Sequence, residues 1–131
     1  MVFNNSEWLS QVTEEILDPA REIVDPHHHL WPGSDMAYNV PELLGDLTSG
    51  HNVVQTIFME CGAAYRKDGP EHLKPIGETA FIAEASAKMK AKGGPYIAAF
   101  IGHTDLRQPT ETLDEVLDAH VEAAKGLFRG I

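Results

Sequence analysis

The chain has 131 residues, of which 43% are hydrophobic and 23% are charged, and its formal net charge is −10 at pH 7. This apolar content is enough for a folded core, so an intrinsically disordered chain is excluded. Because an acidic surface repels phosphate groups, we expect neither nucleic acid nor an anionic membrane as a partner. The longest apolar runs are too short to cross a bilayer, and residues 1–10 lack the pattern of a signal peptide. The single cysteine, Cys61, cannot form an intramolecular disulfide, so we expect a cytoplasmic protein.

The first predicted element is a leading helix over residues 1–17. Trp8, Val12 and Ile16 recur every four residues and form one apolar face of this helix. Pro19 ends it, because the residue before a proline is disfavoured in helical conformation.

Beyond this helix, the sequence predicts that strands and helices alternate. Strands rich in β-branched and aromatic residues, and helices with apolar residues at helical spacing, follow one another. The strands are predicted over residues 22–25, 53–60, 96–102 and 127–131, and the helices over residues 41–47, 77–92 and 112–124. Thr112 and Glu115 are predicted to form a capping box at the start of the last helix.

The alternation predicts an α/β fold, with a parallel sheet and helices outside it. Two architectures fit this order of elements. One is a small doubly wound sheet, and the other is the first half of a TIM (β/α)8 barrel. In both architectures ligands bind at the carboxyl ends of the strands, so functional residues are expected directly after the strands.

Three consecutive histidines, His27, His28 and His29, follow the first predicted strand. In extended backbone, neighbouring side chains point to opposite faces, so His27 and His29 share one face and His28 points away. Two imidazoles at this spacing can hold a divalent cation such as Zn²⁺ from one side. The alternative is a chance cluster in a solvated loop, because His-x-His alone is a common pattern. The position at a strand end favours the metal site, although two ligands do not complete it.

Other polar and aromatic residues lie in or beyond the strand ends. Glu60 can support a metal-bound histidine or bind substrate, and Arg66 can hold a substrate carboxylate, unless both are solvated surface charges. His103 can contact substrate or bound water, or be satisfied by the neighbouring Asp105. The candidate substrate-binding residues are Trp31, Glu60, Tyr65, Arg66 and His103.

The remaining titratable residues give weaker signals. Cys61 is interpreted as a small buried residue at a strand end, because nothing in the sequence requires a thiol nucleophile. His51, His72 and His120 have no comparable position after a strand. We expect His120 to be solvated on the polar edge of its helix.

The run IVDPHHHLW, residues 23–31, resembles the first-strand Asp-x-His-x-His motif of the amidohydrolase superfamily. It is most similar to the branch of predicted metal-dependent hydrolases with TIM-barrel folds called amidohydrolase family 2. Segments that agree with this branch follow in the family's order at residues 59–66, 77–79, 101–106 and 128–131. The resemblance covers the chain from about residue 23 to its last residue.

The resemblance implies that residues 1–131 are the amino-terminal part of one barrel domain, since such barrels need roughly 250 residues. It implies that His27 and His29 bind a divalent metal, Zn²⁺ or Mn²⁺, although some lactonases of this branch work without one. In the family, two further histidines follow the fifth and sixth strands, and an aspartate general base follows the eighth. None of these three residues can be assigned in this chain.

The implied activity of the complete enzyme is hydrolysis of a lactone or similar cyclic ester, a small-molecule substrate, by a metal-activated water. A non-oxidative decarboxylase of the same branch is the near alternative. A third interpretation is a non-catalytic chain that self-associates as a homo-oligomer, because an open half-barrel exposes strand edges and an apolar face. We expect the 131-residue chain alone to be inactive.

Overall fold

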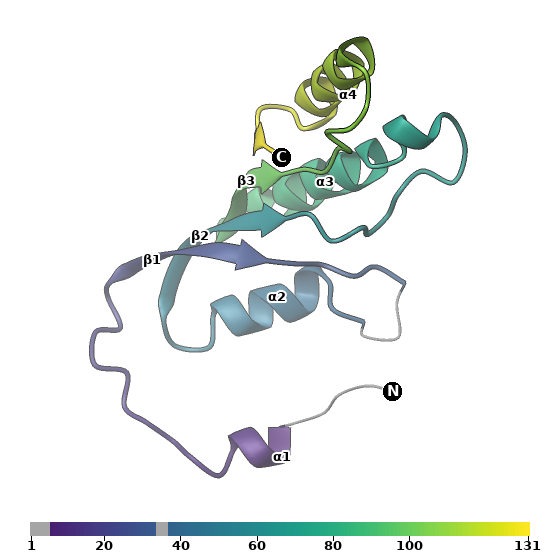
Figure 1. Ribbon diagram of the computed structural model, residues 1–131. Coiled ribbons are helices and arrows are strands. Elements are labelled where there is room, and N and C mark those ends of the chain that lie inside the picture. Colours follow the sequence, from purple (N-terminus) through teal and green to yellow (C-terminus); the bar gives the residue numbers. More distant parts are fainter. Residues whose placement is uncertain (1–5, 34–36) are drawn as a thin grey trace.

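The structure, a computed structural model, describes residues 6–33 and 37–131. Four parallel strands form one sheet in the order of the sequence (Figure 1). The strands are β1 (Glu22–His28), β2 (Asn52–Met59), β3 (Tyr96–Ile101) and β4 (Phe128–Gly130). The helices are α1 (Ser6–Leu9), α2 (Val40–Leu47), α3 (Ile76–Ala91) and α4 (Thr110–Ala123), and the 3-10 turn η1 (Glu71–Leu73) precedes α3.

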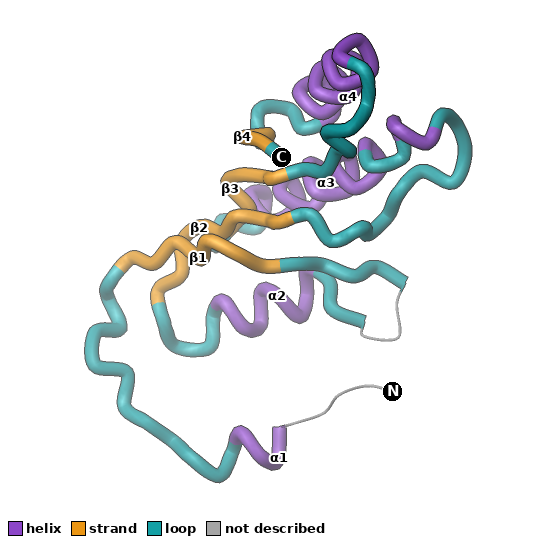
Figure 2. The backbone as a smooth tube through the Cα atoms, viewed as in Figure 1, coloured by secondary structure: helices purple, strands orange, loops and turns teal. Residues whose placement is uncertain are grey.

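The sequential strand order decides between the two predicted architectures. In a doubly wound sheet the order of the strands reverses at a switch point. Here β1, β2, β3 and β4 lie side by side without a reversal, as in the first half of a (β/α)8 barrel. The predicted α/β class with a parallel sheet is confirmed. Figure 2 shows that the loops after β1, β2 and β3 leave the sheet at the same end, which is where ligands are expected.

The helices cover only one face of the sheet. In β2, Thr56 and Phe58 are fully buried, whereas Gln55 and Ile57 on the opposite face remain partly exposed. The core under the helices is built from apolar side chains of both layers. Its members include Leu30, Leu43, Leu47, Phe58, Ile82, Met89, Ile97 and Phe100.

The leading helix is shorter than the sequence predicts. Only Ser6–Leu9 is helical in the described part of the segment, and residues 1–5 lie outside the described residues. Figure 1 shows α1 apart from the sheet, and Trp8 and Val12 are 69% and 70% exposed. A short helix is stable in water only when its apolar face packs against a partner. Ile16 lies against Gly50, but Trp8 and Val12 stay largely exposed, and the predicted helix is wrong beyond Leu9.

The first strand is longer than predicted. The prediction ends it at Asp25, but β1 continues to His28 and pairs with β2 as far as Phe58. The pairing is irregular between Asp25 and His28. Pro26 lies in this interval, and because it has no N–H it cannot donate to a regular ladder. Proline therefore distorts this strand without ending it.

The last helix begins two residues earlier than predicted. The amides of Thr112 and Leu113 donate to the carbonyl of Pro109, so α4 starts at Thr110. The predicted capping box of Thr112 and Glu115 is wrong, because Thr112 lies inside the first turn. Glu115 instead pairs with His72 at 2.9 Å.

Across the described ranges, no helix has the length and apolar character needed to span a membrane.

Candidate metal and substrate site

Two imidazole nitrogens converge at the carboxyl end of β1. The Nε2 atoms of His27 and His29 are 3.2 Å apart, and the two rings are nearly perpendicular. The Nδ1–H of His29 donates to the carbonyl of Met59 at 2.9 Å, which leaves its Nε2 with the lone pair. His27 then donates its Nε2–H to that lone pair. A tetrahedral zinc ion with nitrogen ligands at about 2.0–2.1 Å holds them roughly 3.3 Å apart, so this pair fits a metal.

The irregular part of β1 aims the two histidines. The amide of His27 donates to the Asp25 carboxylate at 3.0 Å, a bond within the irregular interval after Pro26. Strand irregularities of this kind re-aim side chains and are common beside functional sites. The carbonyl of Met59, on the neighbouring strand, fixes the ring of His29. The pairing of β1 with β2 therefore sets the geometry of the histidine pair.

His28 points to the opposite side, into the core, as strand alternation predicts. Its Nε2 lies 2.9 Å from the hydroxyl of Thr56, and its ring packs edge-on against Phe58. Burial lowers the pKa of His28, which favours the neutral ring. His28 is a core residue, and it takes no part in the candidate site.

No group of three or more His, Cys, Asp or Glu side chains that could hold a metal is found in residues 6–33 and 37–131. His27 and His29 could therefore supply two ligands. A catalytic zinc takes three protein ligands and a water.

A second polar pair joins the loops after β2 and β3. The Nδ1 of His103 lies 3.7 Å from Oε1 of Glu60, and the two side chains are 47% and 40% exposed. An exposed pair at this distance contributes little to stability, so both side chains are available to a ligand. Of the two interpretations of His103, the one in which Asp105 forms its hydrogen bond is not what the structure shows. Asp105 instead binds Arg107 through two hydrogen bonds of 2.8 Å, which lower the pKa of Asp105 to about 2.

The aromatic candidates lie near these two pairs. The ring of Trp31 packs against His29, with centroids 5.4 Å apart. Tyr65 and His103 line the same hollow of about 240 Å³. Burial, with the charges of Glu78 and Glu60, raises the pKa of Tyr65 to about 12, so its phenol is a hydrogen-bond donor at neutral pH.

Arg66 follows Tyr65 in the loop after β2. Its side chain is exposed, and within the described chain its guanidinium makes no ion pair. It does not line the hollow that Tyr65 and His103 share. The structure thus brings Tyr65, Glu60 and His103 together and leaves Arg66 outside this group.

The prediction for His120 is wrong, because this side chain is fully buried. Its Nδ1 accepts from the hydroxyl of Thr79 at 2.7 Å, and its Nε2–H donates to the carbonyl of His103 at 3.0 Å. The ring stacks on Phe128, with centroids 5.0 Å apart. A signal was present in the sequence, since Val116, His120 and Ala124 recur every four residues, and all three are buried. His120 links α3 to the loop that carries His103.

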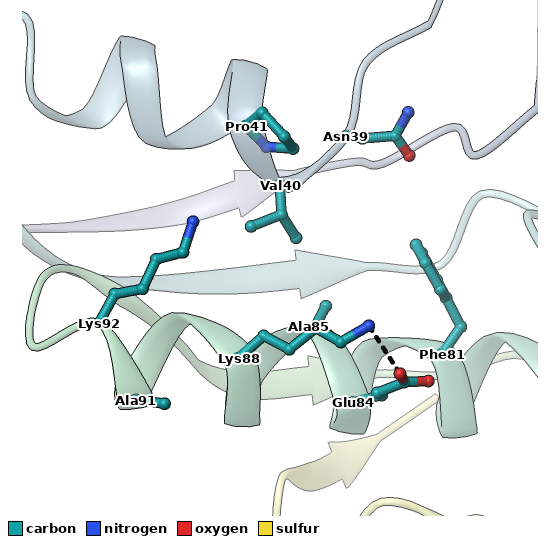
Figure 3. A pocket seen from close by; sticks show the side chains of 9 residues that line it. All are labelled: Asn39, Val40, Pro41, Phe81, Glu84, Ala85, Lys88, Ala91 and Lys92. Atoms are coloured by element: carbon teal, nitrogen blue, oxygen red, sulfur yellow. Dashed lines mark ion pairs between the residues drawn. The ribbon is translucent and has the colours of Figure 1, made fainter.

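A larger hollow of about 500 Å³ lies between α2 and α3 (Figure 3). Its wall includes the apolar side chains of Val40, Pro41 and Phe81. An ion pair of 2.6 Å joins Lys88 to Glu84, one turn earlier on α3. No histidine lines it. This hollow lies on the helix layer and contributes no residue to the candidate site.

Comparison with known proteins gives no identity. No protein-family model, curated protein or solved structure matches the chain. The amidohydrolase resemblance is therefore an interpretation of the motifs, and the function is inferred from the geometry of this chain.

Proposed function

We propose that this chain is the metal-binding part of an amidohydrolase-like hydrolase. His27 and His29 hold one divalent cation, Zn²⁺ or Mn²⁺, through their Nε2 atoms. The observation that carries the proposal is the 3.2 Å approach of these two atoms, with the other ring nitrogen of His29 fixed on the carbonyl of Met59. A ligating histidine that donates its second N–H to a carbonyl is the usual arrangement at metal sites.

The side chains in the loops after β2 and β3 suit a small-molecule substrate. When bound, the metal supplies polarisation of a substrate carbonyl and activation of water. Tyr65 donates a hydrogen bond to a substrate oxygen, because its phenol stays protonated. Glu60 and His103 are placed to exchange a proton with bound water or substrate, since they lie 3.7 Å apart and both face solvent.

The motif resemblance supports a lactone or similar cyclic ester as the substrate class. The single cysteine, Cys61, supports the cytoplasm as the location. A non-oxidative decarboxylase of the same branch is the alternative reaction. Arg66 supports that alternative, because an aromatic acid substrate carries a carboxylate that a guanidinium can bind. Its guanidinium is exposed and forms no ion pair in the described chain. Assays with a lactone and with an aromatic acid separate the two reactions.

Calorimetric titration with Zn²⁺ tests the metal proposal. The unaltered chain is expected to bind one ion, and His27→Ala and His29→Ala are each expected to weaken binding by more than tenfold. His51→Ala is the matched control, because His51 is an exposed histidine outside the pair. Equal binding by all four proteins would contradict the proposal.

The uncovered face of the sheet supports a second candidate function, self-association. Val24 is 49% exposed there, and with Ile57 and Ala98 it lines a hollow of about 460 Å³. In the described part of the chain, β1 and β4 each pair with a single strand. Open strand edges and exposed apolar faces favour association. Native mass spectrometry and light scattering test this, since a monomer at all concentrations would exclude it.

A further inference from the structure

Glu78, in the first turn of α3, is a buried acidic residue. Its side chain is 0% exposed, and of the buried residues in the described ranges it is the sole carboxylic acid. Burying a carboxyl group is costly unless hydrogen bonds replace its hydration. Burial also raises the pKa of Glu78 above its usual range. The hydrogen bonds of the Glu78 carboxyl should therefore show what its burial achieves.

The hydrogen bonds of Glu78 go to the loop after β2. Oε1 accepts from the amide of Cys61 at 3.2 Å and from the amide of Ala63 at 2.7 Å. The Cys61 thiol also lies 3.5 Å from Oε1. Oε2 is buried and finds no hydrogen-bond partner among the residues that the structure describes. The carboxyl therefore binds this loop rather than the helix to which it belongs.

The same loop needs external support. Ala64 has a φ of +55°, a left-handed conformation that costs a non-glycine residue about 1 kcal/mol or more. The loop also lies against the start of α3, because a Cβ on Gly77 would be 2.4 Å from the carbonyl oxygen of Ala64 and 2.6 Å from the amide of Arg66. The conformation of the loop is thus determined by its contacts with α3.

We propose that Glu78 is a positioning residue of the candidate site. Its buried carboxyl fixes residues 61–66, so that Glu60 and Tyr65 stand beside His103 at the carboxyl ends of the strands. Glu60 precedes the first anchored amide, and Tyr65 follows the second by two residues. The use of Glu60 and Tyr65 in chemistry rests on the proposed function, whereas the anchoring of the loop does not.

The charge of Glu78 gives the residue a second effect that an amide would lack. Burial and then the charge of Glu78 raise the pKa of the Cys61 thiol to about 11. The same two causes, in the same order, act on Tyr65. Both groups remain protonated donors at neutral pH. Glu78→Gln keeps an acceptor oxygen for the loop and removes the charge, while Glu78→Ala removes both.

Hydrogen exchange at the amides of Cys61 and Ala63, followed by NMR on the whole chain, tests the anchoring. Glu78→Ala is expected to speed exchange at both amides about tenfold, with the amides of β2 and β3 unaffected. Glu78→Gln is expected to retain the protection. Glu84→Ala, an exposed glutamate on the same helix, is the control and should match the unaltered chain. Unchanged protection in Glu78→Ala, or an equal loss across the whole sheet, would overturn the proposal.

The pH profile of Cys61 alkylation by iodoacetamide tests the charge. The profile is expected to move to lower pH in Glu78→Gln and to stay in place in Glu84→Ala. An unchanged profile in Glu78→Gln would overturn the proposal that the charge of Glu78 acts on the Cys61 thiol. Zn²⁺ binding at His27 and His29 is expected to persist in all these variants. Failure of the metal site is therefore distinguishable from failure of the loop anchor.

Discussion

The imidazole of His29 is held by a carbonyl from the neighbouring strand, since its Nδ1 lies 2.9 Å from the oxygen of Met59. The two residues are 30 positions apart in the sequence. The contact therefore exists only because β1 and β2 pair in parallel. It leaves the Nε2 of His29 directed at the Nε2 of His27, so the geometry of the proposed metal site depends on the sheet.

Asp25 supports this geometry from the other side, and its removal is expected to weaken metal binding. In Asp25→Ala the amide of His27 loses its acceptor at 3.0 Å, and the irregular part of β1 loses a constraint. Partners that orient metal ligands typically contribute about 10- to 100-fold in affinity. Calorimetry with Zn²⁺ should show a loss of that size. Asp18→Ala is the control, because Asp18 is exposed and pairs with Arg21 before the strand. The affinity of this variant for Zn²⁺ should be unchanged.

Gly77 is expected to tolerate no side chain. A Cβ at this position would lie 2.4 Å from a backbone oxygen, which cannot move away as the end of a flexible side chain can. Gly77→Ala should therefore lower the free energy of unfolding by about 1–3 kcal/mol, as measured by urea denaturation. Gly45→Ala is the matched variant, because Gly45 lies in α2 with nothing within 4 Å of an added Cβ. It should stabilise the chain by about 0.5–1 kcal/mol. Equal stabilities for the two variants would contradict the close approach.

Stability is expected to fall in acid, partly because of His120. Burial lowers the pKa of His120 below the unfolded value of 6.5, so below pH 6.5 the unfolded chain binds a proton that the folded chain does not. Stability is therefore full above pH 6.5 and declines as pH falls toward the lowered pKa of the folded state. His120→Gln should show a shallower decline in urea unfolding between pH 7 and pH 5.

The same variant should be less stable at pH 7. Loss of the imidazole removes the partners of the Thr79 hydroxyl and the His103 carbonyl, which costs about 1–3 kcal/mol for each group left unpaired. His51→Gln, at an exposed position, is the control. An identical pH dependence in both variants would show that His120 does not carry the effect.

Self-association is expected to depend on the uncovered face of the sheet. Val24→Lys places a charge on that face, and light scattering should show a smaller average mass than for the unaltered chain. Val121→Lys is the matched control, since Val121 is also an exposed valine but lies on α4. Association that persists unchanged in Val24→Lys would exclude this face as the contact.

Much of the fold could be predicted because the strands and the long helices have strong local patterns. β2, α3 and β3 match the predicted elements to within one residue at each end. The leading helix could not be predicted correctly, because its pattern is helical but Trp8 and Val12 on its apolar face stay largely exposed. Tertiary contacts, rather than periodicity, determine where such a segment is helical.

The candidate site was only partly predictable, for a related reason. Strand alternation places His27 and His29 together and His28 in the core, which needs no tertiary information. Glu78 and His120 were missed because each serves a loop that is distant in sequence. A glutamate in the first turn of a helix ordinarily interacts with the helix dipole at the surface, so its pattern gives no sign of burial.

Histidine ring ¹⁵N NMR during a Zn²⁺ titration tests the two-histidine site most directly. Without metal, His29 should be the Nδ1–H tautomer and His27 the Nε2–H tautomer, as their hydrogen bonds require. One equivalent of Zn²⁺ should shift the Nε2 signals of both rings together, while the Nδ1 proton of His29 stays on the carbonyl of Met59. Unchanged Nε2 signals at saturation, or a response confined to other histidines, would contradict the account.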